Sequence, residues 1–273
     1  MKEGLEMFAV EDLCVSYDKQ KEILHHLSLR FDTHQAVGIL GANGSGKSTL
    51  FAAIVGLLQP TCGQIIYQNQ PLDYHRKSLY HYRQKVGIVF QEPDHQIFYS
   101  IVEEDVAFAL KNLGLDAVEI ERRLNEVFDL LALQPLRKKP IQYLSYGQKK
   151  KIAIASVLVL QTKWILLDEP TAGLDPTGRK QMIDIIFRLL AQGKKVIISS
   201  HDMDLMYEIC DYLYILKEGS LIAEGAKEKV FLNPQVLVEA GLEQPWLVKI
   251  HQRFDLPLFK NEAEFMKSGD VDG

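Results

Sequence analysis

Residues 41–49 carry the most specific chemical pattern in the chain. Glycines recur through this stretch, and Lys47 and Ser48 follow the last of them. Glycine lets the backbone curl so that successive N–H groups point at one anion. The Lys47 ammonium suits the β- and γ-phosphates of a nucleotide, and the Ser48 hydroxyl is a hard oxygen ligand for Mg²⁺. The pattern predicts a nucleoside triphosphate site made by Gly41, Asn43, Gly44, Ser45, Gly46, Lys47, Ser48 and Thr49.

A second group of polar residues follows apolar runs that read as strands: Gln91, Asp168, Glu169 and His201. In an open parallel sheet, ligands bind at the carboxyl ends of the strands. Asp168 is expected to bind Mg²⁺, and Glu169 to orient and deprotonate an attacking water. Gln91 can ligate the metal and hold the water, while His201 can donate to the γ-phosphate. Together these residues predict hydrolysis of the bound nucleotide.

Hydrophobic periodicity predicts the elements that position these residues. Alternating apolar residues over 8–31, with a turn at 18–21, predict an antiparallel β layer, and a strand at 65–67 extends it. Tyr17 ends the first strand, and its ring is either an edge aromatic or a surface on which adenine stacks. Further strands are predicted at 36–40, 86–90, 164–167 and 196–200, and a hairpin at 212–223. Because helical patterns alternate with these strands, the fold class is α/β with a largely parallel sheet.

Helical periodicity dominates two other parts of the chain. Residues 102–113 and 118–133 predict two helices, and a long helix follows residue 148. The lysines at 149–151 are predicted to lie on the solvated face of that helix. After Gly225 the tail is predicted to be helical, broken by prolines, and frayed from about Asn261.

Composition excludes several classes of protein. The net charge of −5 disfavours a protein that grips nucleic acid. The most hydrophobic stretch, residues 152–160, is too short to span a bilayer, and residues 1–4 lack a signal segment. A membrane role would therefore need a partner. The three cysteines, Cys14, Cys62 and Cys210, are scattered and show no metal-like spacing, and neither do the histidines. The cysteines are predicted to be reduced thiols in a cytoplasmic protein.

The ordered set of motifs resembles the ATP-binding cassette (ABC) ATPases over roughly residues 8–225. Residues 41–49 resemble the Walker A loop, residues 164–169 the Walker B strand and residues 144–148 the ABC signature. Four more matches complete the pattern: Tyr17 as the A-loop aromatic, Gln91 as the Q-loop, residues 172–175 as the D-loop and His201 as the switch histidine. The resemblance implies an ATPase that uses ATP and Mg²⁺, the latter held by Ser48, Gln91 and Asp168.

The resemblance also implies a domain organisation. It predicts a P-loop NTPase (RecA-like), mainly parallel core with an N-terminal antiparallel β layer, forming an ABC ATPase domain at residues 6–225. A helical subdomain is inserted at about 92–162, and a short helical C-terminal extension covers 226–273.

The signature stretch is suited to clamping a phosphate. Ser145 is a good helix N-cap, and Gly147 lets backbone approach a ligand at a helix start. By resemblance, Ser145, Gly147 and Gln148 of one subunit close on ATP held by another, in a head-to-tail homodimer with Asp175 across the interface. Tyr146 departs from the family pattern, which has glycine there, and its side chain is expected to face away from the nucleotide.

Residues 90–98, 102–108, 148–155 and 200–205 resemble the energy-coupling factor group, and most of all its cobalt/nickel importer ATPase (CbiO-like). This implies an ATPase that powers import of cobalt or nickel, or else of a vitamin, from the cytoplasmic face of the cell membrane. A soluble ABC ATPase acting on nucleic acid or ribosomes is the alternative from another class; a small-molecule kinase does not fit the signature and His201.

The expected partners are a transmembrane coupling subunit and a substrate-binding membrane subunit, with no nucleic acid and no covalent lipid anchor. Residues 103–105 are acidic. They either form the wall of a groove for the partner's arginine-bearing helices or favour the dipole of their own helix.

Overall fold

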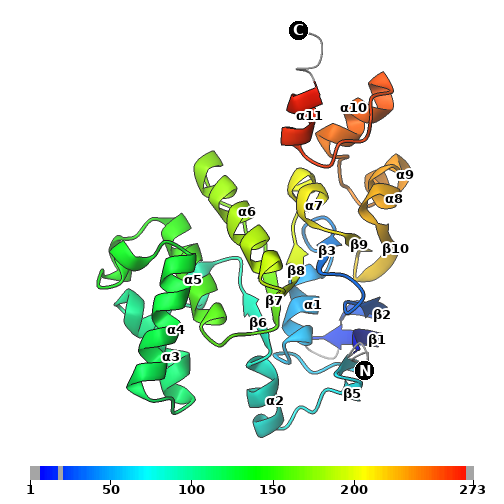
Figure 1. Ribbon diagram of the computed structural model, residues 1–273. Coiled ribbons are helices and arrows are strands. Elements are labelled where there is room, and N and C mark those ends of the chain that lie inside the picture. The colour runs from blue at the N-terminus through cyan, green and yellow to red at the C-terminus, as the bar shows by residue number, and fades with distance from the viewer. Residues whose placement is uncertain (1–6, 18–20, 269–273) are drawn as a thin grey trace, which may run out of the picture. The chain divides into compact units, whose positions relative to one another are not determined.

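The computed structural model describes residues 7–17 and 21–268, and it divides into two compact units. We call them the loop unit, which is the chain up to Leu72 and from Ile198 onward, and the signature unit, Asp73–Ile197. Figure 1 shows their elements in the order of the chain. The predicted turn at 18–21 lies outside the described residues except for Lys21, and so does residue 6, where the ATPase domain was expected to begin.

The antiparallel β layer of the loop unit is confirmed. It contains β1 (Phe8–Ser16), β2 (Glu22–Arg30), β4 (Cys62–Tyr67) and β5 (Gln70–Pro71), in the order β2-β1-β4-β5. The register of β1 is irregular against both β2 and β4 near residues 11–15. Two residues there, Asp12 in β1 and His26 in β2, have left-handed backbone with φ of 50° and 48°.

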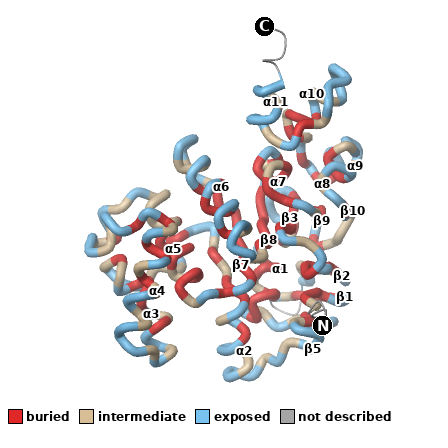
Figure 2. Tube along the Cα trace, in the orientation of Figure 1, coloured by how far each residue is buried: buried red, intermediate tan, exposed pale blue. Residues whose placement is uncertain are grey.

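A second group of strands in the loop unit leads into the glycine-rich stretch. β3 (Ala36–Leu40) is buried throughout and pairs in parallel with β9 (Tyr212–Lys217), which pairs with β10 (Ser220–Ala226). A strand covered on both faces needs an unbroken apolar run, and Figure 2 shows β3 and β9 largely buried. Helix α1 (Lys47–Ile54) follows and contacts β1 and β2. The predicted hairpin at 212–223 is confirmed.

The described part of the loop unit contains five further helices: α7 (Met203–Ile209), α8 (Lys227–Phe231), α9 (Pro234–Glu239), α10 (Trp246–Phe254) and α11 (Glu262–Ser268). The expectation of a frayed end from Asn261 is wrong as far as Ser268. The ring of Phe265 in α11 packs edge-on against Trp246 and Phe259, with centroids 5.4 Å apart in both pairs. This aromatic cluster ties α11 to the preceding helix.

The signature unit holds the strands that carry the predicted carboxylates. β6 (Val86–Val89) and β7 (Trp164–Asp168) pair in parallel, and β8 (Lys195–Ser199) leads back to the loop unit. The unit also contains α6 (Pro176–Ala191) and α2 (Arg76–Arg83). Helix α2 was not predicted. Only Tyr82 of α2 is buried, so this helix has almost no apolar periodicity to reveal it.

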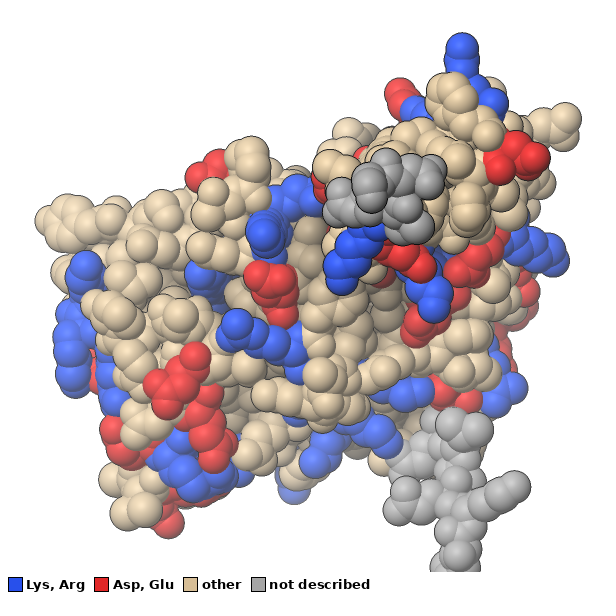
Figure 3. All heavy atoms as spheres, turned by 45° about the horizontal axis from the view of Figure 1, so that its top comes forward, with Lys and Arg blue, Asp and Glu red and all other residues tan. Residues whose placement is uncertain are grey.

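The predicted helices of the signature unit are confirmed. α3 (Val102–Asn112), α4 (Ala117–Leu130) and α5 (Tyr146–Leu158) contact one another, with short 3-10 turns at Pro93–His95, Gln134–Leu136 and Ile141–Tyr143. The outer face of α4 carries Arg122 and Arg123, both paired with Glu119. On the molecular face drawn in Figure 3, basic and acidic side chains are interspersed in the same way.

The acidic stretch at 103–105 lies in the first turn of α3. Glu103 pairs with Arg137 at 2.8 Å and with Lys138. Asp105 is buried, and its carboxylate accepts hydrogen bonds from the backbone of Phe98 and Tyr99. The side chain of Glu104 is exposed. The position of all three residues in the first turn of α3 suits the dipole of that helix, and the groove for a partner stays a prediction.

The prediction of three reduced cysteines is wrong for two of them. Cys14 in β1 and Cys62 in β4 form a disulfide, with Cα atoms 4.9 Å apart, while Cys210 is a buried free thiol. These two residues are 48 positions apart in sequence. The pairing of β1 with β4 makes them cross-strand neighbours.

Among residues 7–17 and 21–268, no helix combines the length and the apolar composition that crossing a membrane requires.

Candidate nucleotide site

The glycine-rich stretch connects β3 to α1, and three of its glycines have backbone that other residues rarely adopt. Gly41, Gly44 and Gly46 have φ of 155°, 82° and 101°. A Cβ on Gly41 would lie 2.4 Å from the Ser45 Oγ, and one on Gly46 would lie 2.6 Å from a Leu24 methyl. Glycine is therefore required for both the conformation and the close packing of this loop.

The loop also presents polar groups suited to phosphate. The Lys47 ammonium, 7% exposed, donates to the backbone oxygens of Gly41 at 2.7 Å and Ala42 at 3.1 Å. The Ser45 Oγ is buried and, among the described residues, has no hydrogen-bond partner. Helix α1 begins at Lys47 behind a glycine N-cap, with no acidic residue in its first turn. An unpaired hydroxyl, an ammonium and a helix N-terminus fit the phosphates of ATP.

Tyr17 lies at the end of β1 and reaches the same loop. Its Oη is 3.2 Å from the Oγ1 of Thr49, and its side chain is 64% exposed. The hydrogen bond positions the phenol while leaving much of the ring accessible. Both predictions for this ring, edge aromatic and adenine platform, are compatible with that exposure.

His201 and the loop face one hollow of about 590 Å³ within the loop unit. It is lined by Ala42 and Asn43, by His201 and Asp202 after β8, and by Trp246 and other residues of the C-terminal helices. Asp202 is the N-cap of α7 and accepts from the Leu205 N–H at 2.9 Å. The structure thus brings together His201 and Asn43, which are far apart in sequence.

The signature unit carries the two acidic candidates at the end of β7. Asp168 and Glu169 are each 6% exposed, and Glu169 has left-handed backbone with φ of 47°. Such a conformation costs free energy in a residue other than glycine, and surrounding contacts must hold it. The Lys150 ammonium supplies them, because it donates to the backbone oxygens of Glu169 at 2.7 Å and Pro170 at 3.2 Å.

Lys150 is a residue that the sequence reasoning misplaced. It is 2% exposed, so the prediction of a solvated lysine is wrong at this position. Burial lowers the pKa of the Lys150 ammonium to about 8, against the opposing attraction of Glu92, Glu169 and Asp168. A signal was present, because Ala153 and Ile154, three and four positions on, are both buried on the same helical face.

The signature residues build the start of α5. The Ser145 Oγ accepts from the Gln148 N–H at 3.3 Å, and the Gln148 side chain accepts from the Ser145 N–H at 3.0 Å. This reciprocal capping box confirms Ser145 as the N-cap of α5. A Cβ on Gly147 would lie 3.3 Å from Leu174, so glycine keeps this turn close to the D-loop stretch.

Tyr146 links three of the predicted motifs. Its Oη donates to the backbone oxygen of Gln91 at 3.1 Å, and its ring lies 5.4 Å from the Lys150 ammonium. A Cβ on Gly173, whose φ is 74°, would lie 2.9 Å from the Tyr146 ring. Burial raises the pKa of the Tyr146 phenol, and the nearby charge of Glu92 adds a smaller increase. The side chain is thus held between the Q-loop and D-loop stretches of its own unit.

Asp175 lies at the end of the D-loop stretch and caps α6. Its carboxylate accepts from the Gly178 N–H at 2.6 Å, and Pro176 occupies the first turn of the helix. The described structure therefore gives Asp175 a local role in starting α6.

The chain is similar to known proteins in sequence and in fold. The pattern of the ABC transporter family matches residues 24–172. The chain is 51% identical to a cobalt import ATP-binding protein, CbiO, of Salmonella typhimurium, covering 95% of each chain. It is 52% identical to a putative ABC transporter ATP-binding protein of Listeria monocytogenes, covering 95% of this chain and 97% of the relative. An energy-coupling factor transporter ATP-binding protein, EcfA, of Methanocaldococcus jannaschii is 40% identical over 88% of this chain and 86% of its own.

Solved structures are similar as well. The cbiO1 protein of Clostridium perfringens, described as part of the ABC transporter complex cbiONQ, has a TM-score of 0.78 at 36% identity, covering 91% of this chain and 95% of that one. An ATP-binding cassette in a dimeric post-hydrolysis state with ADP and inorganic phosphate has a TM-score of 0.73 at 26% identity, covering 81% and 99%. The predicted α/β P-loop fold is confirmed by these likenesses.

Proposed function

The chain belongs to the ABC transporter family, and on this premise we propose that it hydrolyses ATP to drive import of a transition-metal ion, cobalt or nickel, through membrane partner subunits. The transported ion is assigned from one observation: the chain is 51% identical, over 95% of its length, to a protein named for cobalt import. An energy-coupling factor importer with another cargo, such as a vitamin, is the second candidate, supported by the 40% identity to EcfA.

ATP binding is assigned to the loop unit. The residues proposed to hold the phosphates are Gly41, Asn43, Gly44, Ser45, Gly46, Lys47, Ser48 and Thr49, with Tyr17 beneath the adenine. The buried Ser45 hydroxyl and the Lys47 ammonium support this assignment, because both lie in the loop and can donate to phosphate oxygens. The exposed ring of Tyr17 supports the adenine role.

Mg²⁺ is assigned to Ser48, Gln91 and Asp168. All three offer the oxygen donors that Mg²⁺ prefers, and a carboxylate is the usual charged partner. A Mg²⁺ ion held by these residues would supply positive charge that offsets the negative charge of the phosphates during hydrolysis.

The hydrolytic step is assigned to Glu169 and His201. Glu169 accepts a proton from water as the water oxygen bonds to the γ-phosphorus and the bond to the β-phosphate oxygen breaks, giving ADP and inorganic phosphate. His201 donates a hydrogen bond to the γ-phosphate, and Gln91 orients the water. The short bond from Lys150 to the Glu169 carbonyl supports this, since a general base must be held in place.

The signature is assigned to a second copy of the chain. In a head-to-tail homodimer, Ser145, Gly147 and Gln148 of one copy would contact the γ-phosphate bound by the other, with Asp175 at the interface. The capping box at α5 supports this, because it orders a helix N-terminus suited to an anion. One similar cassette was solved as a dimer with hydrolysis products.

The membrane partners are proposed to be a transmembrane coupling subunit and a substrate-binding subunit, which place the chain peripherally on the cytoplasmic face of the membrane. A hollow of about 860 Å³ in the signature unit is the candidate docking surface. Its lining is mostly apolar and includes Tyr80 of α2 and Phe108 of α3, and Arg76 and Arg83 line it as well. We divide the chain into an ABC ATPase domain at 6–225, with a helical subdomain near 92–162, and an extension at 226–273.

Transport by the purified complex tests the proposal. The complex would be purified from detergent extract by a tag on this chain, reconstituted in vesicles and assayed for ATP-dependent accumulation of Co²⁺ and Ni²⁺. Glu169→Gln in the same complex is the matched control, and it should abolish accumulation. Loss of every membrane protein on purification, with retention of RNA, would contradict the importer and favour a soluble ABC ATPase.

A further inference from the structure

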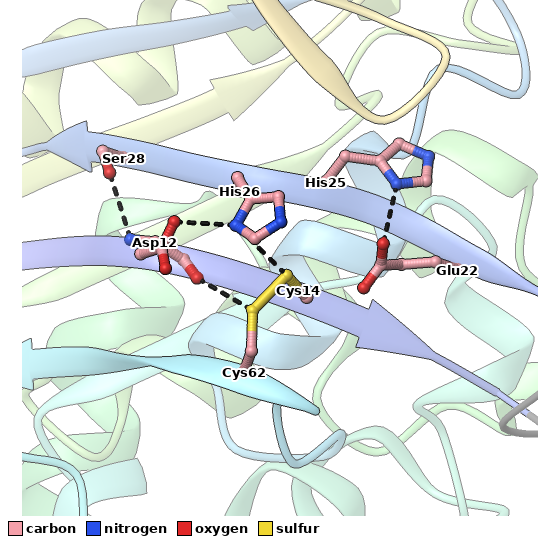
Figure 4. The surroundings of a disulfide bond; sticks show 7 residues. All are labelled: Asp12, Cys14, Glu22, His25, His26, Ser28 and Cys62. Carbon is pink, nitrogen blue, oxygen red and sulfur yellow. Dashed lines mark hydrogen bonds and ion pairs between the residues drawn. A yellow bond between two sulfur atoms is a disulfide. The ribbon is translucent and has the colours of Figure 1, made fainter.

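Three donor side chains converge on one point of the antiparallel layer, and a carboxylate contacts one of them. The sulfurs of Cys14 and Cys62 and a ring nitrogen of His26 all lie within 4.8 Å of one another. The His26 Nδ1 is 3.7 Å from the Cys14 Sγ and 2.8 Å from an Asp12 carboxylate oxygen. Figure 4 shows the imidazole of His26 next to the Cys14 sulfur and the Asp12 carboxylate directed toward that imidazole, while the Cys62 sulfur contacts the backbone oxygen of Asp12.

We propose that Cys14, Cys62 and His26, when the disulfide is reduced, bind one divalent ion of the Zn²⁺ class, with Asp12 as the fourth ligand. Two thiolates, an imidazole and a carboxylate form a ligand set that Zn²⁺ accepts in tetrahedral geometry. With metal–ligand bonds of about 2.0–2.3 Å, the donor atoms of such a site are roughly 3–4 Å apart. The separations of the His26 nitrogen from Cys14 and from Asp12, 3.7 and 2.8 Å, are near that range before any metal is bound.

The disulfide and the metal site exclude each other. A dithiol reductant supplies two electrons and two protons, which convert the Cys14–Cys62 bond to two thiols while the reductant becomes a disulfide. Binding of the ion then releases both thiol protons, because only the thiolate is a ligand. The same residues therefore cross-link β1 to β4 in one state and chelate an ion in the other.

The surroundings favour a site that solvent can reach. Cys14 is buried, whereas the side chains of His26 and Asp12 are each 69% exposed. Asp12 and His26, whose side chains contact each other, both have left-handed backbone. His25, the next residue along β2, instead pairs with Glu22 at 3.1 Å and offers a control with the same chemistry.

Direct metal titration tests the proposal without any readout of ATP hydrolysis, so its outcome is independent of the proposed transport function. The full chain, free of nucleotide and reduced with a phosphine, would be titrated with Co²⁺ and then Zn²⁺. We expect one Co²⁺ per chain, with the strong visible bands of a tetrahedral site and the ultraviolet band of thiolate coordination, both lost as Zn²⁺ displaces it. The oxidised protein should give neither band.

Variants decide which residues are ligands. His26→Ala should weaken Co²⁺ binding at least about tenfold, and because this side chain is exposed the variant should fold normally. Cys62→Ser should remove the thiolate band. His25→Ala and Cys210→Ser are the matched controls and should bind as the parent does. Absence of the thiolate band in the reduced parent, equal affinity in His26→Ala, or loss of the band in Cys210→Ser would overturn the proposal.

Discussion

The Lys150 ammonium lies 2.7 Å from the backbone oxygen of Glu169. This contact joins the helix that follows the signature to the residue assigned as general base. Glu169 has left-handed backbone, and Lys150 also holds the next carbonyl, that of Pro170. A buried cation thus fixes the backbone of an acidic residue that we propose as the general base.

Replacing this cation should lower turnover more than nucleotide binding. In Lys150→Met the two carbonyls lose their donor, which costs about 1–3 kcal/mol per unsatisfied group, and Glu169 is less well held. We expect kcat of ATP hydrolysis to fall about tenfold or more while KM for ATP stays within a few-fold. Lys151→Met, one position on, is the matched control. Equal kinetics of Lys150→Met and the parent would show that the contact is dispensable.

The role of Glu169 as general base predicts a sharper result. Glu169→Gln keeps the size and polarity of the side chain but cannot accept the proton. Steady-state kinetics should show kcat reduced by about 10²–10⁴-fold with ATP still bound, which would trap a closed dimer on a sizing column. Turnover within a few-fold of the parent would falsify the assignment.

Lys47 is predicted to act in binding. Its ammonium is held over the loop by two backbone oxygens, and Lys47→Ala removes the only full positive charge within residues 41–49. Titration with a fluorescent ATP analogue should show loss of tight binding. Thermal unfolding of the ligand-free variant serves as the control for folding, and retained affinity in a folded variant would contradict the phosphate role.

Tyr146 and Gly173 are predicted to be coupled. Gly173→Ala places a Cβ against the Tyr146 ring at a φ of 74°, so it should destabilise the protein by about 1–3 kcal/mol. In the Tyr146→Gly background the steric part of this cost should disappear, and denaturant unfolding of all four proteins measures the difference. Additive effects would mean that the two residues do not touch.

The activity of Tyr146→Gly is a separate test. Because the phenol is engaged with Gln91 and the ring with Lys150, we expect no gain in ATP hydrolysis. A gain of more than about tenfold, equal to roughly 1.4 kcal/mol of barrier, would show that the tyrosine obstructs the clamp.

Burial of Lys150 predicts a pH dependence of stability. The folded pKa of about 8 lies below the ordinary value of 10.5, so between these values the unfolded chain binds more protons than the folded one. The free energy of unfolding should therefore rise with pH across this window, by on the order of 1–3 kcal/mol in total. Lys150→Met should lack this increment relative to the parent; parallel curves for the two proteins would refute it.

Much of the candidate site was readable from the sequence because its chemistry is local. Residues 41–49 form a contiguous loop, and Asp168 and Glu169 directly follow an apolar strand. Such patterns depend on the geometry of one strand, one turn and one helix, so spacing alone predicts them. The capping box at Ser145 and Gln148 is local in the same way.

The rest depended on contacts between distant segments. Lys150 was predicted to be solvated, but packing buries it. The sequence could not show that the Tyr146 side chain contacts Gln91 and lies against Gly173. The sulfurs of Cys14 and Cys62 meet only because β4 pairs with β1. Residue types and their spacing were enough to predict a nucleotide loop and its hydrolytic groups. Only tertiary packing, which sets the register between strands and the buried face of a helix, decided which side chains support them.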